Sequence, residues 1–260
     1  MKSYLYKMEC LTNLHVGSGD INFSIVDNEV EKDPTTGYPT INATGIKGAI
    51  RDYCSANGLN CINKVFGDKG DKETMNAGDF KFFAARFLYR VMRTSGSLPS
   101  VAVTTEAAVN DLLSTAGAFG CNPFGALQIK APAFNGNNFV VNTDKIDTVE
   151  GVPTGKYDSE AVRKVLGLDT FGMARSFDNY DLPVIARNKI NEKTKTSENL
   201  WYEEYVPHGS AFYLIVLTPD SYDKETMLQV IPNSSIIQFG GNASVGYGYC
   251  RMSLIGEGEC

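Results

Sequence analysis

Residues 11–51 read LTNLHVGSGDINFSIVDNEVEKDPTTGYPTINATGIKGAIR, and they are more informative about fold and chemistry than any other part of the chain. The stretch begins with a glycine-broken loop that holds His15, one of only two histidines. A short apolar run then leads to an isolated acid, Asp27. The stretch closes on a predicted helix that carries Lys47 and Arg51 one turn apart. An isolated carboxylate on a loop beside a basic helix start is suited to holding and cutting a phosphodiester.

The patterns around this stretch predict alternating strands and helices. Residues 3–12 alternate and predict a β-strand, whereas residues 23–42 contain turn signals that predict an irregular hairpin. Thr44 is a suitable N-cap for a helix through Ala56, which the following Asn-Gly pair would end. Further elements are predicted at 79–92 (buried strand or strand pair), 106–115 (helix), 159–166 (helix), 182–205 (hairpin), 211–217 (strand), 222–231 (helix), 235–239 (strand) and after the glycine loop at 240–248 (last strand).

The order of these elements predicts an α+β fold. Both ends of the chain combine strands with a helix, which favours an antiparallel sheet with helices on one face. The expected architecture is a ferredoxin-like (RRM-like) core with an inserted middle region and a β-hairpin. The expected division of the single domain, residues 1–260, is a palm core at 1–104 and 200–260, an insertion at 105–181 that includes the Asn-, Gly- and Pro-rich stretch 130–156, and the hairpin at 182–205.

The composition is that of a globular protein. Of the 260 residues, 43% are hydrophobic and 11% aromatic, which excludes wholesale disorder. No apolar run is long enough to cross a membrane and no secretory signal is present, so a cytoplasmic protein without membrane contact is expected. The six cysteines are never spaced Cys-x-x-Cys, which argues against a zinc site or a redox pair.

The net charge of −6 argues against a protein that coats nucleic acid through its whole electrostatic field. Basic residues clustered on one face would still neutralise phosphates. Lys47 and Arg51 are such a pair, because residues at i and i+4 share one face of a helix. This face is either an ordinary solvated surface or a phosphate clamp to which the helix N-terminus adds its positive end.

His15 and Asp27 each allow a structural and a functional interpretation. His15 precedes two glycines that permit close approach of a ligand to the backbone. The pattern is not a dinucleotide fingerprint and no Walker lysine follows, so a nucleotide-phosphate cradle is weakly supported. A lone histidine is more often structural than catalytic. Asp27 suits an Asx turn as well as a catalytic loop, and its function depends on its neighbours.

The second half of the chain adds a basic hairpin, two acids and a glycine loop. Arg187 and Lys189 lie on one arm of the predicted hairpin, which is either an edge protected by lysines or an arm laid across a nucleic-acid strand. Glu203 and Glu204 follow the only tryptophan, and one of them should face inward if the strand alternates. Two acids near a histidine are suited to transferring protons or binding a metal. Equally, they are typical of an edge strand that has to stay soluble. The glycines of 240–248 indicate a tight loop or a backbone packed against RNA or another protein strand.

The motifs HVGSG, IVDN, DPTTGYPTI, GIKGAIR, LWYEEYVP and GGNASVGYGY, taken in this order, resemble the RAMP superfamily of CRISPR-Cas proteins. The resemblance is strongest to the repeating backbone subunit of the type III-B (Cmr) effector complexes, with the backbone subunit of the related Csm complexes as the nearest rival. It covers both ends of the chain and the hairpin, and residues 105–170 contribute little. No single motif is specific; their order and spacing together are.

This resemblance implies a ferredoxin-like palm with a β-hairpin thumb. It also implies partners: a guide RNA, a target RNA, copies of the same chain in a helical filament, and other Cmr subunits. Target RNA would be cut once per subunit beside a displaced base, with a divalent metal, Mg²⁺ or Mn²⁺, as cofactor. The implied catalytic residues are Asp27, which would also bind the metal, His15, Glu203 and Glu204; the implied RNA-binding residues are Ser18, Lys47, Arg51, Arg187, Lys189, Gly240, Gly241 and Asn242.

The chemistry does not require a cluster of carboxylates. RNA carries its own nucleophile, the 2′-hydroxyl, so the protein mainly imposes in-line geometry, and a flipped nucleotide achieves this. One carboxylate then serves as base or metal ligand, and a 2′,3′-cyclic phosphate is the expected product. Two alternatives are an architectural RNA-binding subunit whose aspartate is structural, and a stand-alone metabolic enzyme that binds a small phosphate ligand.

Overall fold

The structure is a computed structural model that describes residues 1–19, 25–68, 76–93, 99–127, 129, 133–134, 138–141, 146–150, 153–154, 159–174, 177 and 182–260. The stretches 23–42 and 130–156, for which the sequence predicts a hairpin and an insertion, lie partly outside these residues.

The described elements follow the predicted alternation of strands and helices. The strands are β1 (Lys2–Cys10), β2 (Lys81–Phe82), β3 (Arg86–Arg93), β4 (Ser100–Thr105), β5 (Ala133–Phe134), β6 (Asn138–Val141), β7 (Ile146–Glu150), β8 (Pro153–Thr154), β9 (Phe171–Ala174), β10 (Val184–Ile190), β11 (Ser197–Glu204), β12 (Ala211–Thr218), β13 (Ser235–Gln238) and β14 (Tyr249–Glu259). The helices are α1 (Ala43–Ala56), α2 (Ile62–Phe66), α3 (Glu106–Ala118), α4 (Ser159–Leu166), α5 (Lys224–Val230) and the short 3₁₀ turn η1 (Ala243–Val245).

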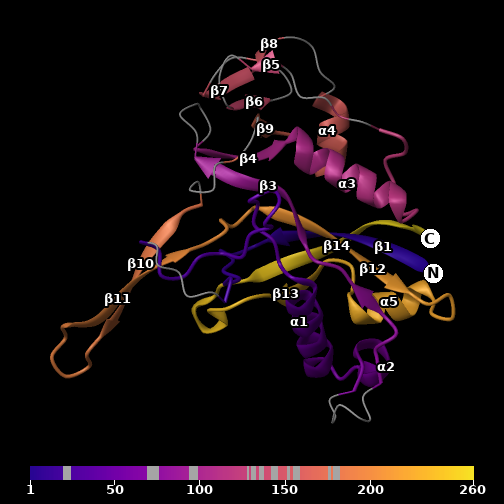
Figure 1. Cartoon of the computed structure of the whole chain (residues 1–260), viewed down its shortest axis with the longest axis horizontal. Coiled ribbons are helices and arrows are strands. Elements are labelled where there is room, and N and C mark those ends of the chain that lie inside the picture. Colours follow the sequence, from indigo (N-terminus) through magenta and orange to yellow (C-terminus); the bar gives the residue numbers. More distant parts are fainter. Residues whose placement is uncertain are drawn as a thin grey trace.

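A large sheet in the order β13-β14-β1-β12-β3-β4-β9-β6-β7 organises the molecule (Figure 1). Its neighbouring strands are antiparallel except for β4 and β9, which are parallel. β2 also pairs with β12. The predicted α+β class with a largely antiparallel sheet is therefore confirmed. β10 and β11 form a separate two-stranded hairpin that projects away from the sheet (Figure 1).

One face of the sheet packs on α1, α2 and α5. The side chains of β1 alternate, so that Tyr4, Tyr6 and Met8 join one core cluster. From α1, Ile46 and Ile50 are fully buried in the same cluster, as the apolar spacing of this helix requires. Burial of each large apolar side chain contributes about 1.5–3 kcal/mol, so this face holds the N-terminal stretch in place.

The other face of the sheet packs on α3 and α4 (Figure 1). Tyr213 and Ile215 of β12 point into this second cluster with Leu112 of α3, Val165 of α4 and Phe171 of β9. The expectation of helices on one face is therefore wrong. β12 is apolar from Ala211 to Leu217, so both of its faces require a cover, and residues from the predicted insertion supply the second one.

The predicted N-cap of the first helix is also wrong. The capping residue is Asn42, which has a non-helical backbone (φ −55°, ψ 148°), and Thr44 lies inside the helix. The Glu31 carboxylate accepts hydrogen bonds from both the backbone N–H and the side-chain amide of Asn42, and this anion favours the helix N-terminus. The helix ends as predicted, at Asn57 followed by Gly58 with φ +73°. No described helix is long and apolar enough to cross a membrane.

The Asp-Pro-Thr-Thr-Gly turn forms around one carboxylate. Asp33 Oδ1 accepts hydrogen bonds from the N–H groups of Thr35 and Thr36 and from the Thr36 hydroxyl. Burial alone would raise the pKa of Asp33, but these hydrogen bonds outweigh it and hold the pKa below its usual value. The Asp33 carboxylate therefore stabilises the fold when it is ionised.

We expect the variant Asp33→Ala to lower the free energy of unfolding by about 1 kcal/mol at pH 7, the typical net value of a hydrogen bond. A group whose pKa is depressed in the folded state contributes stability above its unfolded pKa, about 3.9, and loses it as the pH falls through the folded value. The difference between wild type and variant should thus shrink below about pH 4. Urea unfolding at pH 7 and pH 3.5 measures it, and a difference independent of pH would contradict this account.

Candidate functional site

The segment that carries Asp27 runs along the outer edge of β11. Asn28 forms a parallel bridge with Glu203. The N–H groups of Asp27 and Asn28 both donate to Tyr202 O at 3.1 Å, and Glu204 N donates to Asn28 O at 2.9 Å. This segment therefore acts as a short third strand at the root of the hairpin.

The Asp27 carboxylate is exposed and fixed at that root. Its Oδ2 accepts a hydrogen bond from Tyr202 N at 2.7 Å. Among the described residues, Oδ1 has no recorded partner. Asp27 thus presents one carboxylate oxygen at the surface while the other oxygen holds the side chain in a defined orientation.

His15 lies where the first loop, β11 and the glycine loop meet, and it is 8% exposed. Its Nδ1 is 2.7 Å from Glu204 O. A carbonyl oxygen only accepts, so Nδ1 carries the proton and Nε2 of the neutral ring is the acceptor. His15 O accepts the N–H of Gly241 at 2.9 Å. His15 therefore links β11 to the glycine loop, and the same residue of β11, Glu204, also contacts the Asp27 segment.

Glu203 ties the hairpin to the glycine loop. The residue is 3% exposed. Its Oε1 accepts hydrogen bonds from Arg187 Nε at 3.0 Å and from Asn242 Nδ2 at 2.7 Å, and Arg187 Nη2 lies 2.9 Å away. The Arg187 guanidinium also lies over the Tyr247 ring, 4.7 Å from its centroid, a cation–π contact. The charge of Glu203 is therefore neutralised within the fold.

Glu204 is buried on the opposite side of β11, with 4% exposure. Val30 N donates to its Oε2 at 3.0 Å, and Lys32 Nζ lies 3.0 Å from its Oε1. The expectation that one of the two glutamates faces inward is wrong, because both do. The glycine loop covers one side of β11 at its root, and residues 28–32 cover the other.

Gly240 and Gly248, at the base of the glycine loop, pack against protein. Gly240 and Gly248 have φ values of +73° and +83°, which glycine adopts readily. A Cβ atom at Gly240 would collide with His15 O, and one at Gly248 would collide with Phe239 O. Gly248 N also donates to Asn13 O at 2.8 Å. Of the two partners that the sequence left open, the base of the loop therefore contacts another protein segment.

Lys47 and Arg51 share a face of α1 that is turned toward α2. Arg51 Nη2 is 3.5 Å from Asn63 Oδ1, and Lys47 lines a hollow of about 360 Å³ beside Phe66 and Lys81. Within the described residues, neither side chain forms a hydrogen bond or ion pair with the Asp27 segment.

A different face of α1 looks toward the glycine loop. A groove of about 550 Å³ runs between the small residues of this face and β13, β14 and the loop. Its lining comprises Gly45, Gly48, Ala49, Asp52, Tyr53, Ala56, Ile236, Gln238, Gly240 and Tyr249. The sequence analysis did not single out this groove. The signal for its helical wall was the Gly-x-x-Gly-Ala spacing of residues 45–49, which places small residues on one helical face, whereas nothing local indicates that Gln238 and Tyr249 line the opposite wall.

The remaining RNA-binding candidates lie on either side of this region. Ser18 is half-buried and its N–H donates to Glu29 O at 3.2 Å. Lys189 is exposed on the hairpin, with its Nζ 3.2 Å from Glu198 Oε2. The hairpin therefore holds Lys189 beyond the root where Asp27 lies.

The described residues contain no group of three or more His, Cys, Asp or Glu side chains that is arranged to hold a metal ion. Glu203 and Glu204 are each engaged in an ion pair. Asp27 is thus the exposed acid at the hairpin root. Mg²⁺ is commonly bound by one or two carboxylates together with substrate phosphates and water, so a single carboxylate fits it only when a nucleic acid supplies other ligands.

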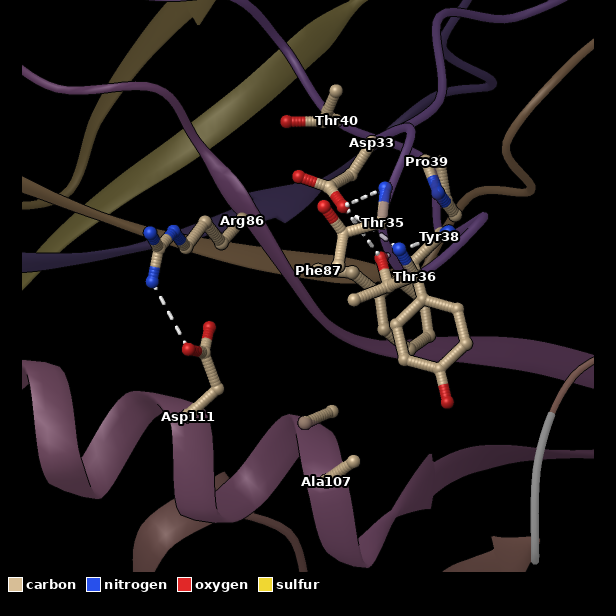
Figure 2. Close-up of a pocket in the computed structure, with 11 residues that line it drawn as sticks. Asp33, Thr35, Thr36, Tyr38, Pro39, Thr40, Arg86, Phe87, Ala107 and Asp111 are labelled. Carbon is tan, nitrogen blue, oxygen red and sulfur yellow. Dashed lines mark hydrogen bonds and ion pairs between the residues drawn. The ribbon is translucent and has the colours of Figure 1, made fainter.

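A separate cavity of about 390 Å³ lies between the Asp33 turn, β3 and α3 (Figure 2). Phe87 and Ala107 contribute apolar surface, and the Arg86–Asp111 ion pair, with 3.0 Å between Nη1 and Oδ1, stands at one side. None of the candidate catalytic or RNA-binding residues lines this cavity. The candidate site is therefore the surface at the hairpin root.

Comparison with known sequences reveals relatives along the whole chain. CRISPR system Cmr endoribonuclease Cmr4 of Pyrococcus furiosus is 28% identical over 288 aligned positions, which cover 98% of this chain and 96% of the relative. CRISPR system CMR subunit Cmr4 of Saccharolobus solfataricus is 25% identical, covering 96% of each protein.

Solved structures share the fold. Oligomeric Cmr4 from Pyrococcus furiosus has a TM-score of 0.70 at 20% identity, covering 98% of this chain and 99% of that chain. A chain of the type III-B Cmr-beta complex bound to cognate target RNA has a TM-score of 0.70 at 20% identity, covering 96% of each. The sequence model of the RAMP superfamily matches residues 7–251, from within β1 to within β14. On the strength of this match across nearly its whole length, the chain belongs to the RAMP superfamily.

Proposed function

We propose that this chain is the repeating backbone subunit of a type III-B CRISPR effector complex, which binds guide RNA and cleaves complementary target RNA. The observation that carries the proposal is the exposed carboxylate of Asp27, fixed by Tyr202 at the root of a projecting hairpin. The full-length similarity to a Cmr endoribonuclease supports the same function. We expect such a complex to act in the cytoplasm.

The proposed palm and thumb correspond to parts of the fold. The strand order β14-β1-β12-β3, with α1 and α5 on one face, supports a ferredoxin-like palm. The β10–β11 hairpin is the proposed thumb. Its register sets Arg187 and Lys189 on one surface and the uncharged, exposed Val184, Leu200 and Tyr202 on the other. The exposed Ile185 lies on the same surface as Arg187 and Lys189. A ribbon that exposes apolar side chains on both surfaces and basic side chains on one is suited to separating stacked bases beside a phosphate backbone.

In the proposed reaction the 2′-hydroxyl of the target attacks the adjacent phosphorus. A bond forms between O2′ and phosphorus, and the bond from phosphorus to O5′ breaks. Asp27 accepts the proton of the 2′-hydroxyl, and the departing O5′ takes a proton from solvent. The products are a 2′,3′-cyclic phosphate and a 5′-hydroxyl. The contribution of the protein is to hold the ribose and the carboxylate in line.

As the alternative to its role as base, Asp27 is the protein group that would hold a divalent metal, and the proton of the 2′-hydroxyl then passes to solvent. When bound, such an ion neutralises charge that develops on the phosphate. Glu203 and Glu204 contribute by fixing the hairpin root, since both are buried in ion pairs.

We expect chelation with EDTA to lower the cleavage rate of the assembled complex at least tenfold, on the order of the loss of a charge-stabilising group. Mg²⁺ or Mn²⁺ should restore the rate. The melting temperature should change little, because the described residues form no preassembled metal site. Gel assays of cleavage and a thermal melt test both points. Full activity in EDTA would remove the metal from the proposal.

The function itself is tested by assembling the chain with guide RNA and the other subunits of its complex. A complementary target should be cut at regular intervals into fragments that end in a 2′,3′-cyclic phosphate. An assembly that binds the target and leaves it intact would instead establish an architectural subunit. A purified chain free of RNA, with a protein-like ratio of absorbance at 260 and 280 nm, would favour a metabolic enzyme.

A further inference from the structure

Both carboxylate oxygens of the buried Glu204 are engaged by other groups of the protein, so this side chain is placed to hold structure together and not to transfer protons. Its side chain is 6% exposed, and each of its two oxygens has a partner. Oε2 accepts the N–H of Val30 and Oε1 pairs with Lys32 Nζ, both at 3.0 Å. Burial of a carboxylate costs free energy unless the group is paired and hydrogen-bonded. The segment around residues 30–32 is therefore most stable in the position where Val30 and Lys32 reach the two oxygens of Glu204.

The main chain of the same residue adds two further contacts. Glu204 N donates to Asn28 O at 2.9 Å, and Glu204 O lies 2.7 Å from His15 Nδ1. One residue therefore contacts the Asp27 segment at positions 28, 30 and 32, and it also orients the imidazole. The Asp27 carboxylate, which bonds to Tyr202 N two residues earlier on β11, depends on this alignment.

We infer that Glu204, together with Lys32, is a positioning residue for target cleavage: the pair holds residues 27–32 along β11 and so sets the place of the Asp27 carboxylate. Glu204 does not itself exchange a proton with the substrate. This inference rests on the proposed function, and it assigns Lys32 a role that the sequence motifs do not suggest.

The variants Lys32→Met and Glu204→Gln test the inference in the assembled complex. Lys32→Met removes the cation and leaves Glu204 to accept from Val30 N, while Glu204→Gln removes the negative charge and keeps a carbonyl acceptor. Each should lower the rate of target cleavage by about 10- to 100-fold, the effect of a misplaced catalytic group, with target binding unchanged. Lys32→Arg should restore most of the rate. Both substitutions break the same contact, the Lys32–Glu204 ion pair. The double variant should therefore cleave target RNA no more slowly than the slower of the two single variants.

The ion pair between Lys224 and Glu257 offers a matched control. Its Nζ–Oε1 distance is 2.9 Å, and it joins the same two residue types on α5 and β14. Lys224→Met and Glu257→Gln should leave cleavage unchanged. The shape of the pH–rate profile should also stay the same in the Lys32 and Glu204 variants, whereas loss of a proton-transfer group removes one limb of the profile.

Hydrogen exchange of the peptide covering residues 25–32 provides a readout that does not depend on cleavage. We expect faster exchange there in Lys32→Met and Glu204→Gln, with β1 and β12 still protected. Unchanged exchange, equally faster exchange throughout the chain, or a Glu204→Gln variant as inactive as Asp27→Ala with an altered pH profile would each overturn the inference. If the wild-type assembly cuts no RNA, the proposed function fails, and the exchange data alone then decide whether the pair holds this segment.

Discussion

The variant Asp27→Ala is expected to cleave target RNA at least about 100-fold more slowly than wild type, the low end of what a general base contributes. Asp27 is exposed, so its removal leaves no cavity in the core. The N–H of Tyr202 loses its side-chain acceptor but stays at the surface, where water replaces it. Guide and target binding should therefore be retained, and the loss should fall on the chemical step.

Asp27→Asn separates the charge from the geometry. The amide oxygen still accepts from Tyr202 N, but the side chain no longer takes up a proton or attracts a cation. We expect the asparagine variant to be about as slow as the alanine variant. Single-turnover cleavage with labelled target measures the rate, and gel shifts measure binding. Asp220→Ala, at an exposed aspartate paired with the N-terminal amine, is the matched control and should cleave normally. Cleavage that persists in both Asp27 variants would remove this residue from the mechanism.

The variant Phe171→Ala is expected to lower the free energy of unfolding by about 3–5 kcal/mol, the usual effect of truncating a buried phenylalanine. Phe171 is fully buried in the cluster between the sheet and helices α3 and α4. Its removal leaves a cavity that the surrounding strands fill only in part. Because the same cluster contains Tyr213 of β12, the loss should destabilise the whole domain.

Urea unfolding followed by circular dichroism measures this effect. Ile236→Ala is the control, since Ile236 is 51% exposed on the edge strand β13 and its truncation should cost less than about 0.5 kcal/mol. A loss below about 1 kcal/mol for Phe171→Ala, or a second transition at lower urea, would mean that the middle region unfolds independently of the sheet.

Helices and strands whose own residues carry a clear signal were predicted correctly. A helix at 159–166 and a buried strand at 211–217 were predicted, and the structure has a helix at Ser159–Leu166 and a strand at Ala211–Thr218. The end of α1 was predicted because Asn-Gly carries its own conformational preference. The start of α1 was not, because Thr44 and Asn42 are both good caps and the choice depends on Glu31, eleven positions before Asn42.

The arrangement of layers depends on distant contacts and was predicted less well. A strand as uniformly apolar as β12 signals cover on both faces, but nothing local indicates that the second cover comes from the middle of the chain. The prediction that only one of Glu203 and Glu204 faces inward was wrong for a related reason. Alternation along β11 correctly sets Glu203 and Glu204 on opposite sides, but it does not reveal that loops from elsewhere cover both sides at the root.

The structure brings together some of the residues that the sequence proposed for the site. Asp27, His15, Glu203 and the glycine loop are linked by hydrogen bonds through β11 at the hairpin root. The prediction from the sequence included these residues. It also grouped Lys47 and Arg51 with them, whereas the structure turns these two toward α2. Helical spacing shows which residues share a face, and the buried stripe of Ile46 and Ile50 sets which side of the helix meets the core. It does not show which neighbouring segment each of the remaining faces meets, because that depends on distant parts of the chain.

The glycine loop combines a base that tolerates no side chain with a tip that is open. Gly240 and Gly248 are closed to any larger residue, whereas a Cβ atom at Gly246 would meet nothing within 4 Å, and Ser244 is exposed. Substitutions should therefore be tolerated at Ser244 and rejected at the base, whereas the φ of +84° at Gly246 favours glycine there despite the open space. A fluorophore attached at position 244 would sit beside the candidate site, because Asn242 and Gly241 of the same loop are hydrogen-bonded to Glu203 and His15, and this makes the tip an attachment point for reporting the arrival of a nucleic acid.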